Sequence, residues 1–141
     1  MATANPNPIF SRVGAIGGIG STTLTTAAAD YTGISANNSL IFTADASNGG
    51  FVQRIRFKAL GTNAVTVARV YINNGSTSGT ASNNVFYGEV SLPATTAITT
   101  AATVDVDYPM NFALPPGYKL YVGLGATVVA GWVASVIAGA Y

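Results

Sequence analysis

The sequence predicts an all-β, single-domain fold, a jelly-roll-like β-sandwich of about eight strands. Segments that alternate apolar and polar residues recur along the 141-residue chain, and Gly, Asn, Ser or Pro separates each from the next. Period-2 alternation indicates half-buried strands, and no stretch repeats its apolar residues with a helical period. Connections of about ten residues between several strands favour a jelly roll over an up-and-down barrel, whose turns are shorter.

Residues 51–73 show the alternation most clearly, and we expect a β-hairpin there with its turn at residues 61–63. The second arm alternates Ala68, Val70 and Ile72 with Arg69 and Tyr71. The first arm is expected to place its side chains in two opposite rows, an apolar row of Phe51, Gln53, Ile55, Phe57 and Ala59 and a basic row of Val52, Arg54, Arg56 and Lys58.

The other expected strands cover residues 39–46, 85–92, 104–112, 118–124 and part of 127–141, and Pro109 marks an edge strand or a bulge. Residues 21–38 are expected to hold one weak strand and a loop. We divide the chain into an N-terminal arm, residues 1–20, and a sandwich domain, residues 21–141. The Gly-rich residues 9–20 loosely resemble a nucleotide-binding loop, but no helix-forming sequence follows, so a strand or arm fits better.

The composition argues against most enzymes. Charged residues are 8% of the chain, the formal net charge is +1, and there is neither histidine nor cysteine. Histidine is the commonest general base, and zinc sites use histidine and cysteine, so we expect no enzymatic activity, no metal and no cofactor. A weakly charged surface predicts a subunit that lies against other subunits, and a soluble β-domain that works alone is the alternative.

A basic stripe is the first candidate site, and it comprises Arg54, Arg56, Lys58 and Arg69. Such stripes can bind nucleic acid, but the net charge of +1 provides no long-range attraction for a phosphate backbone. We therefore expect the stripe to pair, within or between subunits, with the carboxylates of Glu89, Asp105 and Asp107.

Asp105 and Asp107 are the only closely spaced carboxylates. As i, i+2 residues of a strand they would face the same way about 7 Å apart, near the spacing of glycosidase acid and base groups. A pairing with the basic stripe, or solvation of one strand face, explains the same pattern without catalysis.

The last 22 residues, 120–141, carry no charge. Hydropathy alone would indicate a membrane helix, but the glycines and the alternation favour two buried strands, and we expect no membrane partner. We expect a homo-oligomer, a trimer ahead of a dimer, because a monomer would have to expose Trp132 and Tyr141. The expected contact residues in this segment are Trp132, Val133, Ile137 and Tyr141.

Four phrases, at residues 54–63, 69–78, 114–125 and 131–141, resemble small virion proteins of tailed bacteriophages. They are RIRFKALGTN, RVYINNGSTS, LPPGYKLYVGLG and GWVASVIAGAY, and the likeness covers roughly residues 51–141. The resemblance implies a jelly-roll capsid decoration or cement protein, made in the host cytoplasm, which binds the major capsid protein on the outer shell. It implies no catalytic residue.

A second functional class is a head-fibre or tail-associated module that binds a host glycan or receptor. The loops over residues 75–84 and 93–103 would present Thr and Asn to the sugar, but they contain no aromatic residue. Sugar sites commonly stack an aromatic ring on the sugar, so Tyr87, at the boundary of the first loop, is the residue to test.

Overall fold

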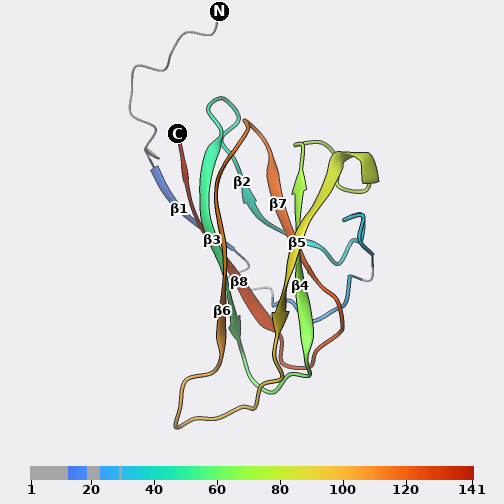
Figure 1. The fold of residues 1–141 in the computed structure, drawn as a ribbon, viewed down its shortest axis with the longest axis vertical. Coiled ribbons are helices and arrows are strands. Elements are labelled where there is room, and N and C mark those ends of the chain that lie inside the picture. Colours follow the sequence, from blue (N-terminus) through green and yellow to red (C-terminus); the bar gives the residue numbers. More distant parts are fainter. Residues whose placement is uncertain (1–12, 19–22, 29) are drawn as a thin grey trace, which may run out of the picture.

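The computed structural model describes residues 13–18, 23–28 and 30–141, which form two four-stranded antiparallel sheets (Figure 1). Sheet A has the strand order β1 (Val13–Gly18), β8 (Trp132–Ala140), β3 (Gly50–Ala59) and β6 (Asp105–Leu114). Sheet B has the order β2 (Ser39–Thr43), β7 (Lys119–Leu124), β4 (Thr66–Asn73) and β5 (Asn84–Leu92). The helical structure in the described residues is one 3-10 turn, η1 (Ala81–Asn83), so the predicted all-β class is confirmed.

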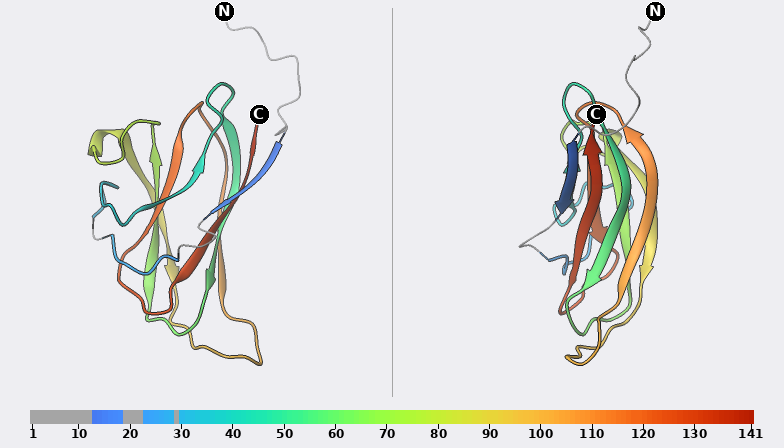
Figure 2. Two further views of the ribbon diagram at one scale, coloured as in Figure 1. Left: turned by 180° about the vertical axis from the view of Figure 1, so that it is seen from behind. Right: turned by 90° about the vertical axis from the view of Figure 1, so that its left-hand side faces the viewer.

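The two sheets face each other, and apolar side chains from both fill the space between them (Figure 2). Fully buried side chains include Val52, Ile55, Phe57, Val70, Leu120, Val122, Leu124, Trp132 and Val136. All of these lie on β3, β4, β7 and β8, the strands that have a neighbour on both sides. Each large apolar side chain removed from water contributes roughly 1.5–3 kcal/mol, so the four inner strands provide most of the core's stabilisation.

The predicted hairpin over residues 51–73 is wrong. Its two arms are β3 and β4, which lie in different sheets: β3 pairs with β6 and β8, and β4 pairs with β5 and β7. The connection over residues 60–65 crosses from sheet A to sheet B. Alternation in the sequence reports that one face of a strand is buried, but it does not report which strand lies beside it.

A β-bulge in β3 also changes the predicted rows of side chains. The register shifts between Val52 and Arg54 against both neighbouring strands, and Val52 is buried whereas Gln53 is exposed. The opposite expectation for these two residues is wrong, because a bulge inverts the alternation on one side of it. Residues after the bulge, from Arg54 to Ala59, follow the predicted alternation.

The β-bulge opposite residues 109–112 also explains how β6 accommodates a proline at position 109. Pro109 lies on β6, the edge strand of sheet A, and the register passes directly from Val52↔Phe112 to Arg54↔Pro109. Asn111 within this step has a φ of +53°, a left-handed conformation that asparagine tolerates better than most residues. The prediction of an edge or a bulge at Pro109 is confirmed in both respects.

The range predicted as an N-terminal arm contains β1. Every residue of β1 pairs with β8, from Val13↔Ala140 to Gly18↔Ser135. Residues 1–12 and 19–20 of the predicted arm lie outside the described residues.

The uncharged segment 120–141 contains most of β7, a turn and β8. Within the described parts of the chain, no helix has the length and apolar character that crossing a bilayer requires. The interpretation of this segment as buried strands is confirmed for β8, whose residues alternate between the core and the outer face of sheet A.

Trp132 is fully buried within the single chain, so the expectation that a monomer would expose it is wrong. It lies at the start of β8 beside Ala59 of β3, and its backbone exchanges two hydrogen bonds with Leu24. Ala59 and Leu24, its neighbours, belong to the same chain. Trp132 therefore gives no argument for a subunit contact.

Because Trp132 is the only tryptophan, its fluorescence tests this assignment directly. We expect blue-shifted emission and weak acrylamide quenching at every protein concentration, including dilutions at which subunits separate. Emission that shifts to the red, or quenching that rises, in step with dissociation would place Trp132 at a subunit contact instead.

Candidate functional site

No described segment covers the outer face of sheet A, as the right-hand view of Figure 2 shows, and we call this surface the bare face. Its central residues are Arg54, Arg56 and Lys58 from β3, Asp105 and Asp107 from β6, and Val133, Ser135 and Ile137 from β8. Three of the four residues of the predicted basic stripe are therefore on one face.

Strand pairing arranges these residues in rows across the sheet. The cations of β3 form the middle column, with carboxylates toward the β6 edge and mostly aliphatic side chains toward β8. The three rows are Val133–Lys58–Asp105, Ser135–Arg56–Asp107 and Ile137–Arg54–Pro109.

Arg56 is the centre of an ion-pair group on the bare face. Its Nε and Nη2 donate to the two carboxylate oxygens of Asp107 at 2.8 and 3.1 Å, and Nη2 lies 3.7 Å from Asp105. These hydrogen bonds and the charge of Arg56 hold the pKa of Asp107 below its ordinary value. The predicted pairing of stripe and carboxylates is confirmed for Arg56, so both carboxylates have a structural partner.

The other two cations of the bare face have no such partner. Among the described residues, neither Arg54 nor Lys58 forms a salt bridge, although Lys58 donates a hydrogen bond to the carbonyl of Thr103. With three cations and two carboxylates, the face carries a formal charge of +1.

A shallow hollow of ≈ 240 Å³ lies on sheet A beside the bulge of β3. Its lining comprises Phe51, Gln53, Ile137, Ala138 and Gly139. The hollow lies where Gly139 has no side chain and where the bulge of β3 shifts the register at Gln53.

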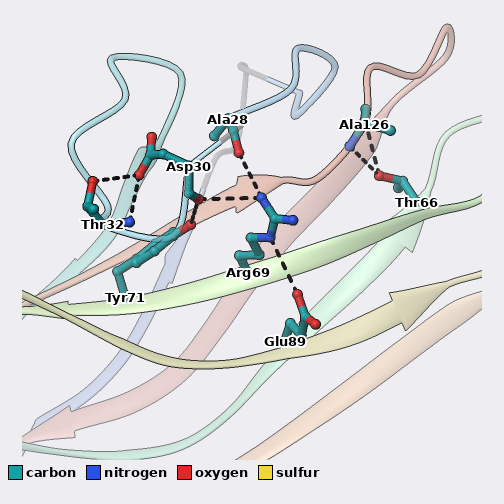
Figure 3. A network of polar contacts seen from close by, with 8 residues as sticks. All are labelled: Ala28, Asp30, Thr32, Thr66, Arg69, Tyr71, Glu89 and Ala126. Carbon is teal, nitrogen blue, oxygen red and sulfur yellow. Dashed lines mark hydrogen bonds and ion pairs between the residues drawn. The ribbon is translucent and has the colours of Figure 1, made fainter.

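Arg69, the fourth residue of the predicted stripe, lies on the outer face of sheet B (Figure 3). Its side chain is buried, and Nη1 donates to the carbonyls of Ala28 and Asp30 at 3.2 and 3.4 Å. Nε lies 3.4 Å from a carboxylate oxygen of Glu89, as predicted, and the guanidinium lies 4.1 Å from the ring centroid of Tyr31. Arg69 is therefore separate from the other three cations, and the prediction of one continuous stripe is wrong.

The contacts of Arg69 hold a segment that we call the strap, Ala27 and Ala28 together with residues 30–38. Tyr71 of β4 adds a hydrogen bond of 2.8 Å from its hydroxyl to the carbonyl of Asp30. Gly123 of β7 permits the close approach, because a Cβ there would lie 2.8 Å from that of Ala28 and collide with Asn38. The strap thus covers the middle of sheet B, whereas no described segment covers sheet A (Figure 2).

The predicted contact residues at the C-terminus lie in different environments. Trp132 belongs to the core, whereas Val133 and Ile137 are half-buried on the bare face. Tyr141 is half-buried beyond the end of β8, and its backbone N–H donates to the carbonyl of Gly49 at 3.5 Å. Only Val133 and Ile137 of this group share a face with Arg54, Arg56 and Lys58.

An aromatic group between the edge strands β5 and β6 was missed by the sequence analysis. The ring of Tyr87 lies 5.1 Å from Phe112 and 6.3 Å from Tyr108, and 41% of Tyr87 is exposed. Gly88 makes room for the hydroxyl of Tyr108, with which a Cβ would collide. The register of β5 shifts beside Tyr87, and this shift had no signal in the sequence.

The described residues include no group of three or more His, Cys, Asp or Glu side chains placed to hold a metal ion. No protein-family model matches the sequence, and no curated protein or solved structure matches the chain. Inferences about function therefore depend on the geometry and chemistry of these surfaces.

Replacing Arg69 with methionine should weaken the fold and release the strap. The variant loses two hydrogen bonds to carbonyls and one to Glu89, and a single hydrogen bond that involves a charged group contributes roughly 1.5–3 kcal/mol. We expect a lower urea midpoint and faster hydrogen exchange at the amides of Thr32 and Gly33. The matched control is Arg56→Met on the exposed bare face, for which we expect a clearly smaller effect. Equal effects of the two substitutions would contradict the assigned role of Arg69.

Proposed function

We propose that the protein is a capsid decoration or cement protein of a tailed bacteriophage, which binds the outer shell through its bare face and stabilises contacts between major capsid proteins. The observation that carries the proposal is the difference between the two sheets. The chain covers sheet B with its own strap, and the described residues leave sheet A uncovered. A broad, nearly neutral sheet face suits contact between protein surfaces.

The strand order supports jelly-roll topology as part of this proposal. The orders β1-β8-β3-β6 and β2-β7-β4-β5 are those that two interlocked Greek keys produce from eight consecutive strands. All connections except the one between β4 and β5 pass from one sheet to the other. The resemblance to phage virion proteins implies the same topology.

The chemistry of the bare face favours a protein partner over a nucleic acid. Arg56 is neutralised by Asp105 and Asp107, so among the described residues of this face Arg54 and Lys58 are the cations left for a partner's acceptors. Phosphate-backbone binding requires several unpaired cations, and two provide little of its affinity. The half-buried Val133 and Ile137 add apolar area beside these cations, as at the centre of a protein–protein contact.

The first test is the heat resistance of the shell. Shells that lack the protein should release DNA at a lower temperature than complete shells, because each bound copy must separate before its capsid neighbours do. Equal heat resistance with and without the protein would contradict the proposed function.

The bare face is tested separately by Lys58→Glu. Reversing this half-buried cation should weaken co-sedimentation with shells by roughly tenfold, because a partner's acceptor would then meet a like charge. The matched control is Lys119→Glu on β7 of sheet B, which makes the same charge change away from the bare face. Equal losses for both variants would show that net charge, and not the bare face, controls attachment.

The alternative function, a phage module that binds a host glycan, is favoured by one observation. Tyr87 is an exposed ring supported by Phe112 and Tyr108, an arrangement that could stack on a sugar. If this function is correct, a glycan array will show saturable binding that Tyr87→Ala abolishes and Lys58→Glu preserves. No saturable signal from the unmodified protein would remove this alternative.

A further inference from the structure

Three connections meet at one end of the sandwich, and we call this surface the loop end. They are residues 60–65 between β3 and β4, residues 93–104 between β5 and β6, and residues 125–131 between β7 and β8. All three lie at the lower end in Figure 1, where the 93–104 connection reaches furthest from the sheets. A Cβ added at Gly61 would lie 3.0 Å from Ala130 and 4.0 Å from Ala97, so the connections pack together.

A buried hydrogen-bond network holds the loop end in one conformation. Asn63 and Thr95 exchange two backbone hydrogen bonds of 3.0 and 2.9 Å, which join the first connection to the second. The amide group of Asn63 accepts from the backbone N–H of Gly131 at 2.7 Å and donates to the carbonyl of Gly131 at 3.1 Å. Both Asn63 and Thr95 are buried, so the surface is preorganised by polar groups beneath it.

The surface above this network is apolar and uncharged. None of the three connections contains Asp, Glu, Lys or Arg. Large aliphatic side chains are strongly exposed on it: Val129 at 91%, Val65 at 67%, and Leu60 and Ile98 at 52% each. Leu60 and Ile98 also line a groove of ≈ 490 Å³ that includes Gly61, Ala97, Thr99 and Thr103. Exposed apolar groups concentrated on a rigid surface indicate a contact with another molecule.

We propose that the loop end binds a second copy of this chain, so that the copies meet around a rotation axis that passes through it. Near such an axis each residue faces its own counterpart, and a charged residue would face a like charge. The loop end has no charge to repel its copy. Contacts with an unrelated protein gain specificity from complementary charges, which this surface does not carry. We therefore expect the copies to meet at the loop end and not at Trp132 of the C-terminal strand, which is already buried within one chain.

The absence of cysteine permits a direct test by single-cysteine variants. Val129→Cys and Ile98→Cys place a thiol at the loop end, and the matched control Val85→Cys places one at an exposed valine near the opposite end of β5. We expect a short bismaleimide to link Val129→Cys or Ile98→Cys chains in pairs at micromolar concentration, with at least a tenfold higher yield than Val85→Cys. Equal yields from the three variants would overturn the proposal.

The second measurement is native mass spectrometry of the unmodified chain and of the double variant Ile98→Asp, Val129→Asp. The unmodified chain should form an oligomer, and the double variant should raise its apparent dissociation constant by roughly a hundredfold, because unpaired carboxylates would enter a desolvated contact. Circular dichroism should show the same fold, since both positions are exposed. An unmodified chain that is monomeric at micromolar concentration, or a folded double variant that stays oligomeric, would overturn the proposal.

These outcomes are independent of the proposed function. The variant made monomeric by Ile98→Asp and Val129→Asp at the loop end keeps its bare face, so its single copies can still co-sediment with shells. Equal heat resistance of shells with and without the protein would contradict the proposed function, and it would leave the mass of the oligomer unchanged. Failure of one proposal is therefore distinguishable from failure of the other.

Discussion

The hydrogen bonds from the guanidinium of Arg69 to the strap determine which of the two sheets is covered. The guanidinium lies on the outer side of sheet B, and its donors hold the backbone of the strap at Ala28 and Asp30. A buried guanidinium is costly unless its donors are satisfied and its charge is paired, and here two carbonyls, Glu89 and the ring of Tyr31 provide these contacts. Because the strap is held there, the middle of sheet B is covered, whereas no described segment covers sheet A (Figure 2).

The few charges of the chain are used mainly within it. Arg69 pairs with Glu89, Arg56 pairs with Asp105 and Asp107, and the carboxylate of Asp30 accepts hydrogen bonds from its own turn at Thr32 and Gly33. Among the described residues, Arg54 and Lys58 of the bare face remain without a salt bridge, and the three connections of the loop end carry no charge. A small protein with such surfaces has little charge repulsion to keep its copies apart, which is suited to a subunit of an assembly.

The sequence predicted strands well and strand neighbours poorly. The strands around Ile55, Val70 and Val136 follow from local alternation, and Pro109 correctly indicated an edge with a bulge. The hairpin failed because the turn residues 61–63 also serve a connection between sheets, in which Asn63 bonds to Thr95 and Gly131. The alternation predicted for Val52 and Gln53 is wrong because the bulge beside them depends on two partner strands that come from distant parts of the chain.

The sequence by itself determined the all-β class, the uncharged last segment and the low net charge, because these follow from composition and from period-2 alternation. The tertiary structure alone decided which sheet each strand joins, that Trp132 belongs to the core, that Arg69 leaves the basic stripe, and that Leu60, Ile98 and Val129 gather at one end. The physical reason is that alternation records burial of one side of a strand, whereas sheet order, bulges and loop clusters depend on contacts between residues far apart in the chain.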